Sequence, residues 1–380
     1  MCESITKQFL RGCGEQTKIE KSEDLAAFFR KNIPAGCHAA LLFSEGESPE
    51  RIRRFMEMLA GFSPRTAMLG EGSVMSLFSL PDDVRAAVGV GARAITAARF
   101  FTTLRGGICV ALPDSPSADG CFEREAPPPF AGYPLRFPDL IALSTNEMCR
   151  SEGTTLAETA LCALCAEELR TDALFSGTEH DVSPFERLTE EVRTLCRKGA
   201  ISREKLFCVS ASFLIALQKY SRFACLGFDR FLKRRMPQNA AQSSFAVLKY
   251  SAKRYVSLFE RAVPRAYFVP DYVARVKRAA NELGASPKTI FANVRVPTAA
   301  ESFARIGIFT ESRRRMAVSA RLLESFVRDV ACAYCAKERE KSVRFPLEEG
   351  YDVSAECTPL LCAPALEREF GLSPRFAVRV

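Results

Sequence analysis

The sequence is poor in the residues that most often bind metals or transfer protons at neutral pH. Its 380 residues include two histidines, His38 and His180, and no tryptophan. Histidine is the commonest metal ligand, and its ordinary pKa lies near neutrality. Acid–base chemistry in this chain would therefore need an Asp, Glu, Cys or Lys with a shifted pKa. We expect His38, which opens an apolar run, to be structural and His180 to lie in a polar segment between helices.

The sequence also lacks a long hydrophobic run. No segment approaches the ~18 uncharged apolar residues that a membrane-spanning helix needs, and the first residues lack the basic-then-apolar order of a secretory signal. We therefore expect a cytoplasmic protein with no membrane partner. Its fifteen cysteines should then stay reduced and act mainly as small apolar residues.

Four of these cysteines form two CxxC pairs, Cys162/Cys165 and Cys332/Cys335. Each pair falls in an apolar helical pattern, where residues three apart share one face. A four-thiolate zinc site is an alternative if the two helices meet, although the long separation is unlike compact zinc modules. We favour thiols that pack in or near the core.

The charge is mildly basic, with 53 Lys and Arg against 45 Asp and Glu, which gives +8. Nucleic-acid binding proteins usually show a basic face interleaved with stacking aromatic residues. The basic clusters here, such as residues 233–235 and 313–315, lie in helical patterns that are typical of solvated faces. We expect no nucleic-acid partner, and a small acidic molecule such as a phosphate suits the charge better.

Strands and helices alternate in the first part of the chain. The pattern predicts strands at 38–43, 65–69, 84–90, 108–112 and 139–143, with helices at 49–59 and 94–104. Such alternation implies crossover units and a parallel sheet. Residues 1–146 are therefore predicted to form a Rossmann-like α/β domain.

The apolar period becomes helical after residue 154. Helices are predicted at 156–174, 184–197, 203–220, 245–259, 271–283 and 313–337. We assign residues 147–338 to an all-α domain, since single cores rarely exceed roughly 250–300 residues. Residues 339–380 contain scattered prolines and form an irregular tail to which we assign no role.

The order of these elements, together with residues 89–99 and the loop at 113–120, resembles a known superfamily. It contains iron-containing alcohol dehydrogenases, dehydroquinate synthases and, as the most similar members, sn-glycerol-1-phosphate dehydrogenases. The resemblance covers residues 18–338. The family loop reads Pro-Thr-x-x-Ser-x-Asp-Gly, and Pro113, Ser117, Asp119 and Gly120 match it. The resemblance implies NAD(P), a divalent metal and a polyol or alcohol substrate.

The cofactor motif departs from the family pattern. The family has a glycine triplet at the strand-to-helix turn, because glycine lets the backbone approach a dinucleotide pyrophosphate. Val90, Gly91 and Ala92 stand there, followed by Arg93 in place of a small residue. Arg93 opposes the helix dipole by roughly 0.3–1 kcal/mol, which either a bound anion or simple exposure would explain. The resemblance implies these cofactor-binding positions: Gly89, Gly91, Ala92, Arg93, Ser115 and Ser117.

The metal motif departs further. The family binds Zn²⁺ or Fe²⁺ through one Asp and two His, and Thr154, Arg230 and Gln242 align with these ligands. We therefore expect no Zn²⁺ or Fe²⁺, since the guanidinium of Arg230 would repel a cation. The nearby carboxylates and thiol are the alternative ligands: Glu152, Glu158, Asp229 and Cys225. Arg230 could instead hold an anionic oxygen of a substrate.

Three hypotheses follow. The first is a diverged glycerol-1-phosphate-dehydrogenase-like protein that binds a small anionic metabolite in the interdomain cleft, with Ser117, Asp119 and Arg230 as contacts, and lacks metal-assisted hydride transfer. The second is an active NAD(P)-dependent oxidoreductase with an atypical site, in which Asp119 is the best catalytic candidate. The third is a regulatory or structural subunit, and a homo-oligomer is compatible with each. Asp119 has an equally simple interpretation as a turn residue before glycine.

Overall fold

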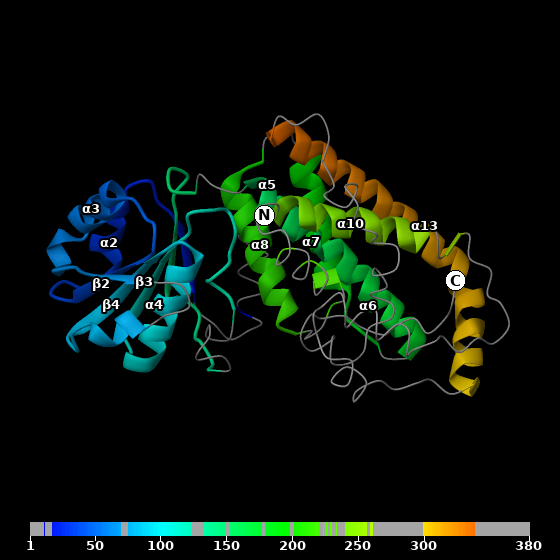
Figure 1. Ribbon diagram of the computed structural model, residues 1–380, viewed down its shortest axis with the longest axis horizontal. Helices are drawn as coiled ribbons and strands as arrows, with labels where there is room; N and C mark the ends of the chain where they lie inside the picture. The colour runs from blue at the N-terminus through cyan, green and yellow to red at the C-terminus, as the bar shows by residue number, and fades with distance from the viewer. Residues whose placement is uncertain are drawn as a thin grey trace. The chain divides into compact units, whose positions relative to one another are not determined.

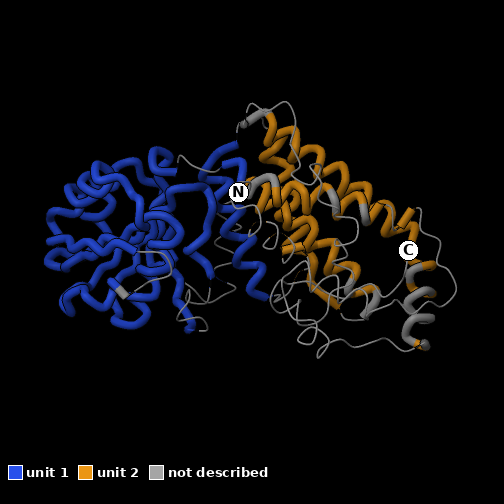
Figure 2. The backbone as a smooth tube through the Cα atoms, viewed as in Figure 1, with its two compact units in different colours: residues 1–155, 201–219 blue, residues 156–200, 220–380 orange. Residues whose placement is uncertain are grey.

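The computed structural model describes residues 11, 17–69, 75–123, 133–148, 152–176, 179–197, 201–219, 223, 225–226, 229, 233, 240–256, 259–260 and 299–338. The chain divides into two compact units (Figure 2). Unit 1 comprises residues 1–155 and 201–219, and unit 2 comprises residues 156–200 and 220–380. The predicted helix at 271–283 and the predicted irregular tail lie outside the described residues.

Unit 1 is built on a six-stranded sheet in which every pair of neighbouring strands is parallel (Figure 1). The strand order is β1-β6-β5-β4-β2-β3. The strands β2, β4 and β5 are buried along most of their length, as expected for parallel strands covered on both faces. This sheet confirms the predicted fold class. The strands are β1 (Lys18–Lys21), β2 (His38–Ser44), β3 (Arg65–Leu69), β4 (Val84–Val90), β5 (Ile108–Leu112) and β6 (Leu140–Leu143).

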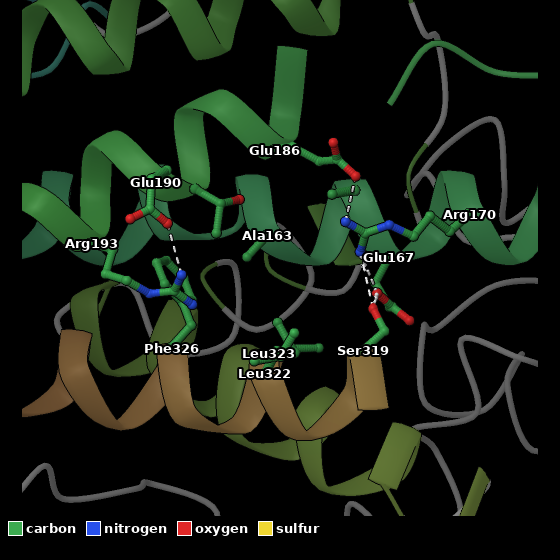
Figure 3. A pocket seen from close by; sticks show the side chains of 12 residues that line it. Ala163, Glu167, Arg170, Glu186, Glu190, Arg193, Ser319, Leu322, Leu323 and Phe326 are labelled. Atoms are coloured by element: carbon green, nitrogen blue, oxygen red, sulfur yellow. Dashed lines mark hydrogen bonds and ion pairs between the residues drawn. The ribbon is translucent and has the colours of Figure 1, made fainter. Parts of the chain in front are cut away.

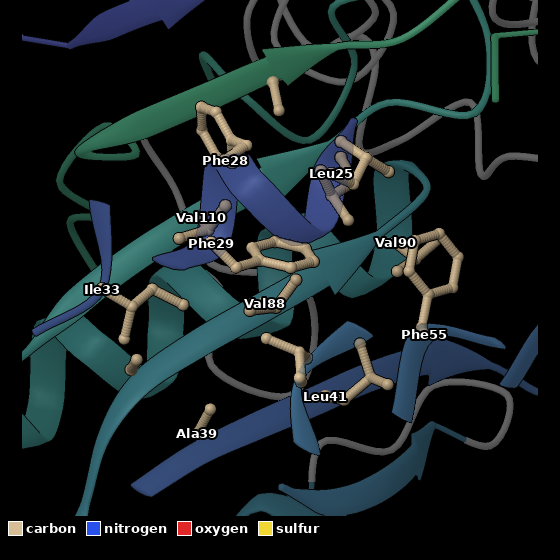
Figure 4. Close-up of a cluster of buried hydrophobic side chains, with 14 of the residues drawn as sticks. Leu25, Phe28, Phe29, Ile33, Ala39, Leu41, Phe55, Val88, Val90 and Val110 are labelled. Carbon is tan, nitrogen blue, oxygen red and sulfur yellow. The ribbon is translucent and has the colours of Figure 1, made fainter. Parts of the chain in front are cut away.

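Helices cover both faces of this sheet. On one face, α2 (Leu25–Asn32) and α3 (Pro49–Met58) bury aromatic side chains such as Phe29 and Phe55 against β4 and β5 (Figure 4). On the other face, α4 (Ala92–Arg105) and α8 (Arg203–Leu217) pack against alternate residues of the same strands. Short 3₁₀ turns occur at Ala60–Phe62 and Met75–Ser79. Successive residues of a strand point to opposite faces of the sheet, so they pack alternately against the helices of one face and those of the other.

Local capping fixes where several of these helices begin. The side chain of Ser48 accepts a hydrogen bond from the backbone N–H of Arg51, and Pro49 fills the first helical position of α3. Asp24 caps α2 and Ser202 caps α8 in the same way. Although α8 follows unit 2 residues in the chain, its Phe207 and Ile215 are buried in the core of unit 1.

The described part of unit 2 is helical, as predicted for the second part of the chain. One correction concerns residues 156–174, which were predicted to form a single helix. Leu161 interrupts them, because its N–H bonds the carbonyl of Glu158 three residues back and tightens the end of the first helix. The helices are α5 (Glu152–Ala160), α6 (Cys162–Ser176), α7 (Ser183–Arg197), α10 (Ala240–Val256) and α13 (Ala299–Glu338).

The long helix α13 organises the core of unit 2. It packs against α6, α7 and α10, and Tyr334 meets Phe245 of α10 with ring centroids 4.6 Å apart. Its buried residues recur every three or four positions, as an amphipathic helix requires: Met316, Ala320, Leu323, Phe326, Val330 and Tyr334. Among the described residues, no helix combines the length and the apolarity that crossing a bilayer demands.

Candidate functional site

The glycine turn between β4 and α4 is the first candidate site. Gly91 is the N-cap residue of α4, with a φ of 80°, and makes no side-chain capping hydrogen bond. A Cβ on Gly89 would lie 2.5 Å from the carbonyl oxygen of Ala94, so α4 packs directly on the backbone of β4. Ala92 and Arg93 follow on the exposed surface of the first helical turn. The first four of the implied cofactor positions thus form one turn.

Asp114 lies over this turn, a feature that the sequence analysis did not single out. Its carboxylate oxygens lie 3.0 and 3.3 Å from the place that a Cβ on Gly91 would occupy. The family loop has threonine at this position. A carboxylate beside a helix N-terminus is favourable because of the helix dipole, but it would repel a phosphate placed there. The sequence did contain a signal for this feature, because Asp114 stands where the family loop has threonine.

The serines of the loop support its own conformation. The Ser115 hydroxyl accepts from the N–H of Ser117 at 3.4 Å, and the Ser117 hydroxyl accepts from the N–H of Asp119 at 3.2 Å. Gly120, with a φ of 80°, packs on the first turn of α4, since a Cβ there would lie 2.1 Å from the carbonyl oxygen of Ala92. The structure therefore brings the loop and the glycine turn together, with Asp119 exposed.

Arg99 binds the backbone of the loop and of the residues near it, and the sequence analysis did not identify this residue. Its side chain is fully buried. The guanidinium donates to the carbonyl oxygens of Gly120 at 2.7 Å and Arg136 at 2.9 Å, and also to that of Glu123. Burial raises the pKa of the Glu123 carboxyl. Arg99 gave no sequence signal, because an arginine in a helical pattern is usually on the surface.

A second charged cluster, also missed, lies after the ends of β2 and β6. The carboxylate of Glu147 is largely buried and is bound by Arg51 at 3.2 Å and Arg54 at 2.5 Å. Arg51 also pairs with Glu47 at 2.6 Å. Carboxyl ends of parallel strands are the usual ligand edge of such sheets. In this cluster the two arginines are paired with Glu47 and Glu147.

The three positions aligned with metal ligands are only partly described. Thr154 is half-buried on α5. Arg230 lies outside the described residues, and Gln242 belongs to α10 but its side chain lies outside them. Neighbouring residues from the same three segments do meet, however, within unit 2. They are Glu158 of α5, Asp229 and Lys233, and Ser244 of α10.

Lys233 joins the two carboxylates of this group, which we call the Lys233 cluster. Its ammonium nitrogen lies 2.7 Å from Glu158 Oε1 and 2.6 Å from Asp229 Oδ2. The Ser244 hydroxyl donates to Asp229 Oδ1 at 2.7 Å. Burial acts to lower the pKa of Lys233, but the two carboxylates outweigh it and raise that pKa above its ordinary value. The ammonium is therefore fixed and charged at neutral pH.

The described residues of these segments do not fit a divalent metal. Among the described residues, no group of three or more His, Cys, Asp or Glu is arranged to hold one. Glu158 and Asp229 supply two carboxylates, but a cation of the chain already lies between them. Cys225, another alternative ligand, faces Cys165 with the two sulfurs 3.8 Å apart, and burial raises its pKa well above the ordinary value. Glu152 pairs with Arg203 in unit 1.

The structure describes both histidines and both CxxC pairs. His38 opens β2, with Nδ1 3.7 Å from the Asp83 carboxylate, and His180 lies between α6 and α7. Cys162 and Cys165 are buried on α6, and Cys162 contacts Thr189 at 3.6 Å. Cys332 is exposed and Cys335 half-buried on α13. The four-thiolate zinc alternative is therefore wrong, because these cysteines form no group that could hold a metal.

A pocket of about 190 Å³ opens in unit 2 between α6, α7 and α13 (Figure 3). Arg170 at one end pairs with Glu167 at 2.7 Å and Glu186 at 2.6 Å. Arg193 at the other end pairs with Glu190 at 2.8 Å. Since both guanidiniums are bound by carboxylates of the same pocket, it is a poor site for an anion.

Comparisons with known proteins bear on the fold. No protein-family model and no curated protein matches this sequence. Among solved structures, an alcohol dehydrogenase from Oenococcus oeni matches with a TM-score of 0.54 and 9% identity over 94% of each chain. A glycerol dehydrogenase from Schizosaccharomyces pombe has a TM-score of 0.45 and 12% identity, over 87% of this chain and 93% of that one. An iron-containing alcohol dehydrogenase from Thermotoga maritima has a TM-score of 0.45 and 12% identity, over 82% and 98%.

The Oenococcus oeni match establishes the architecture and not the activity, because its identity is 9%. The predicted resemblance is confirmed at the level of the fold, while the specific likeness to glycerol-1-phosphate dehydrogenases stays a prediction. This chain has the fold of an alcohol dehydrogenase.

Proposed function

We propose that the chain is a diverged protein of the alcohol-dehydrogenase fold that lacks metal-assisted hydride transfer and binds a small anionic metabolite, such as a phosphorylated polyol. The observation that carries the proposal is the Lys233 ammonium between Glu158 and Asp229. These three residues come from the segments that the sequence resemblance aligns with the metal ligands of the family. A metal would polarise the substrate carbonyl toward hydride, whereas this ammonium is neutralised by two carboxylates.

Asp114 supports the part of this proposal that concerns the lack of hydride transfer. A carboxylate over Gly91 disfavours a dinucleotide pyrophosphate at the turn, because both groups are negative. An anionic metabolite then needs another cation. Arg230 is the contact that we propose for the phosphate, because a guanidinium binds phosphate oxygens in a bidentate way.

The test uses the purified natural chain in three measurements. Metal analysis should find less than stoichiometric zinc, iron or manganese, and titration with NADH and NADPH should give no saturable fluorescence change. Sn-glycerol 1-phosphate or dihydroxyacetone phosphate should raise the melting temperature, since a ligand at about 100 times its Kd stabilises a protein by about 2.7 kcal/mol. Glycerol, which lacks the phosphate, is the matched control.

Arg230→Met should abolish the shift with phosphates and leave the melting temperature of the free protein nearly unchanged. Stoichiometric metal together with micromolar NAD(P)H binding and turnover would instead establish an active oxidoreductase. A chain that responds to none of the phosphates but co-purifies with an intact dehydrogenase would be a regulatory or structural subunit. Either result contradicts the proposal.

A further inference from the structure

The Lys233 cluster permits a step beyond the proposed function. We infer that the Lys233 ammonium is a built-in replacement for a divalent cation, and that its removal leaves a site for such a cation between Glu158 and Asp229. The inference rests on that part of the proposed function which gives the natural chain no resident metal. It concerns the chemistry of the cluster and is independent of which metabolite the protein binds.

The geometry is close to that of a metal site. One carboxylate oxygen from each acid lies within 2.7 Å of a single nitrogen. Divalent cations such as Mg²⁺ and Ca²⁺ are held about 2.0–2.6 Å from their oxygen ligands. The two oxygens would therefore move by only a few tenths of an ångström to bind a metal ion in place of the ammonium. The other Asp229 oxygen is already fixed by the Ser244 hydroxyl at 2.7 Å.

The charge and burial of the cluster require a cation. The Asp229 side chain is 7% exposed and that of Glu158 is 29% exposed. Two carboxylates that share one partner in a partly buried site repel one another, and the positive charge between them offsets this repulsion. This charge also links Glu158 of α5 to Asp229, and the Ser244 hydroxyl links Asp229 to α10. A metal ion would make the same links.

The donor set decides which metal fits. Carboxylate and hydroxyl oxygens favour hard cations such as Mg²⁺ and Mn²⁺ over Zn²⁺, which prefers nitrogen and sulfur ligands. Mn²⁺ is the better probe because its free form is read directly by electron paramagnetic resonance.

The experiment compares the natural chain with Lys233→Ala and with Lys233→Arg, which keeps a positive charge at the same position. Lys233→Ala should bind about one equivalent of Mn²⁺ at least about tenfold more tightly than the natural chain does. Its melting temperature should rise with Mn²⁺ concentration and fall again when EDTA is added. The natural chain and Lys233→Arg should show neither effect.

Asp229→Asn in the Lys233→Ala background removes one ligand and should abolish the Mn²⁺ effect. If Lys233→Ala is too unstable to purify alone, Lys233→Gln keeps the length of the side chain and should be restored by Mn²⁺ in the same way. A folded variant without Mn²⁺ binding, or failure of Mn²⁺ to restore either variant, overturns the inference and leaves the proposed function standing. Stoichiometric metal in the natural chain overturns both.

Discussion

The glycines of this chain differ in their backbone conformation and in the space around them. Gly91 and Gly120 adopt a positive φ, and Gly120 also lies against the backbone of α4. Gly89 has an ordinary φ but no room for a side chain, because the backbone of α4 lies directly above it. Gly61, in a 3₁₀ turn, has neither constraint. The cost of adding a methyl group should follow these differences.

Gly89→Ala should be destabilising, because its Cβ would lie 2.5 Å from the Ala94 carbonyl oxygen and 2.6 Å from the Ile95 Cα. Backbone atoms cannot rotate away, so we expect a loss of about 1–3 kcal/mol or more in the free energy of unfolding. Gly61→Ala is the matched control and should change it by less than about 0.5 kcal/mol. Urea denaturation followed by circular dichroism measures both, and equal midpoints would contradict the packing described here.

Helix α8 packs on the sheet of unit 1, although residues of unit 2 separate it from that sheet in the chain. Phe207 and Ile215 are buried in the core of unit 1. Its first turn is bound by ion pairs, from Lys21 of β1 to Glu204 at 2.6 Å and from Arg203 to Glu152. Hydrogen bonds from Lys21 and Ser202 lower the pKa of Glu204 to about 2. The attachment should therefore depend on pH.

Glu204→Gln should lower stability by an amount that varies with pH. The native carboxylate titrates near pH 2, and the unfolded one near 4.5. Between these values the unfolded chain binds more protons, so the stabilisation by Glu204 is fully present above 4.5 and is lost as the pH falls toward 2. Denaturation across this range should show the two proteins converging at low pH. A difference that is constant with pH would rule out the ion pair as its cause.

Burial across the whole molecule sorts the cysteines into classes of different reactivity. None of the ten described cysteines is joined in a disulfide. Cys332 is exposed, and Cys37, Cys196 and Cys335 are half-buried. Burial raises the pKa of Cys109 to about 12. The remaining buried thiols are Cys121, Cys162, Cys165, Cys208 and Cys225. This distribution agrees with the expectation that cysteines serve here as small apolar residues.

Among the ten described cysteines, alkylation of the native protein with iodoacetamide at neutral pH should modify Cys332 first, since the thiolate is the nucleophile and must be accessible. Cys109 and the other fully buried cysteines should react only after unfolding in guanidinium. Peptide mass spectrometry gives the rate at each site. Rapid native labelling of Cys109 would show that the sheet of unit 1 opens on the timescale of the reaction.

The periodicity of the sequence predicted the parallel sheet because strands buried on both faces must be apolar along most of their length, as β2 and β4 are. It also predicted most of the helices, whose buried residues recur every three or four positions. The break at Leu161 escaped prediction, because a single 3₁₀-type bond leaves the apolar pattern unchanged. The local pattern of residues likewise does not show that α8 packs in the core of unit 1.

What the sequence determined by itself was the class of fold, since periodicity is a local property. From residue identity the sequence also predicted that the metal ligands of the resembling family are lost. It predicted that a cation of the chain would stand where the metal belongs, and it assigned that role to Arg230. Only the tertiary structure revealed Lys233 between Glu158 and Asp229 and Asp114 over Gly91. These contacts join residues from different elements, and the strength of an ion pair depends on distance and burial, which no spacing along the chain encodes.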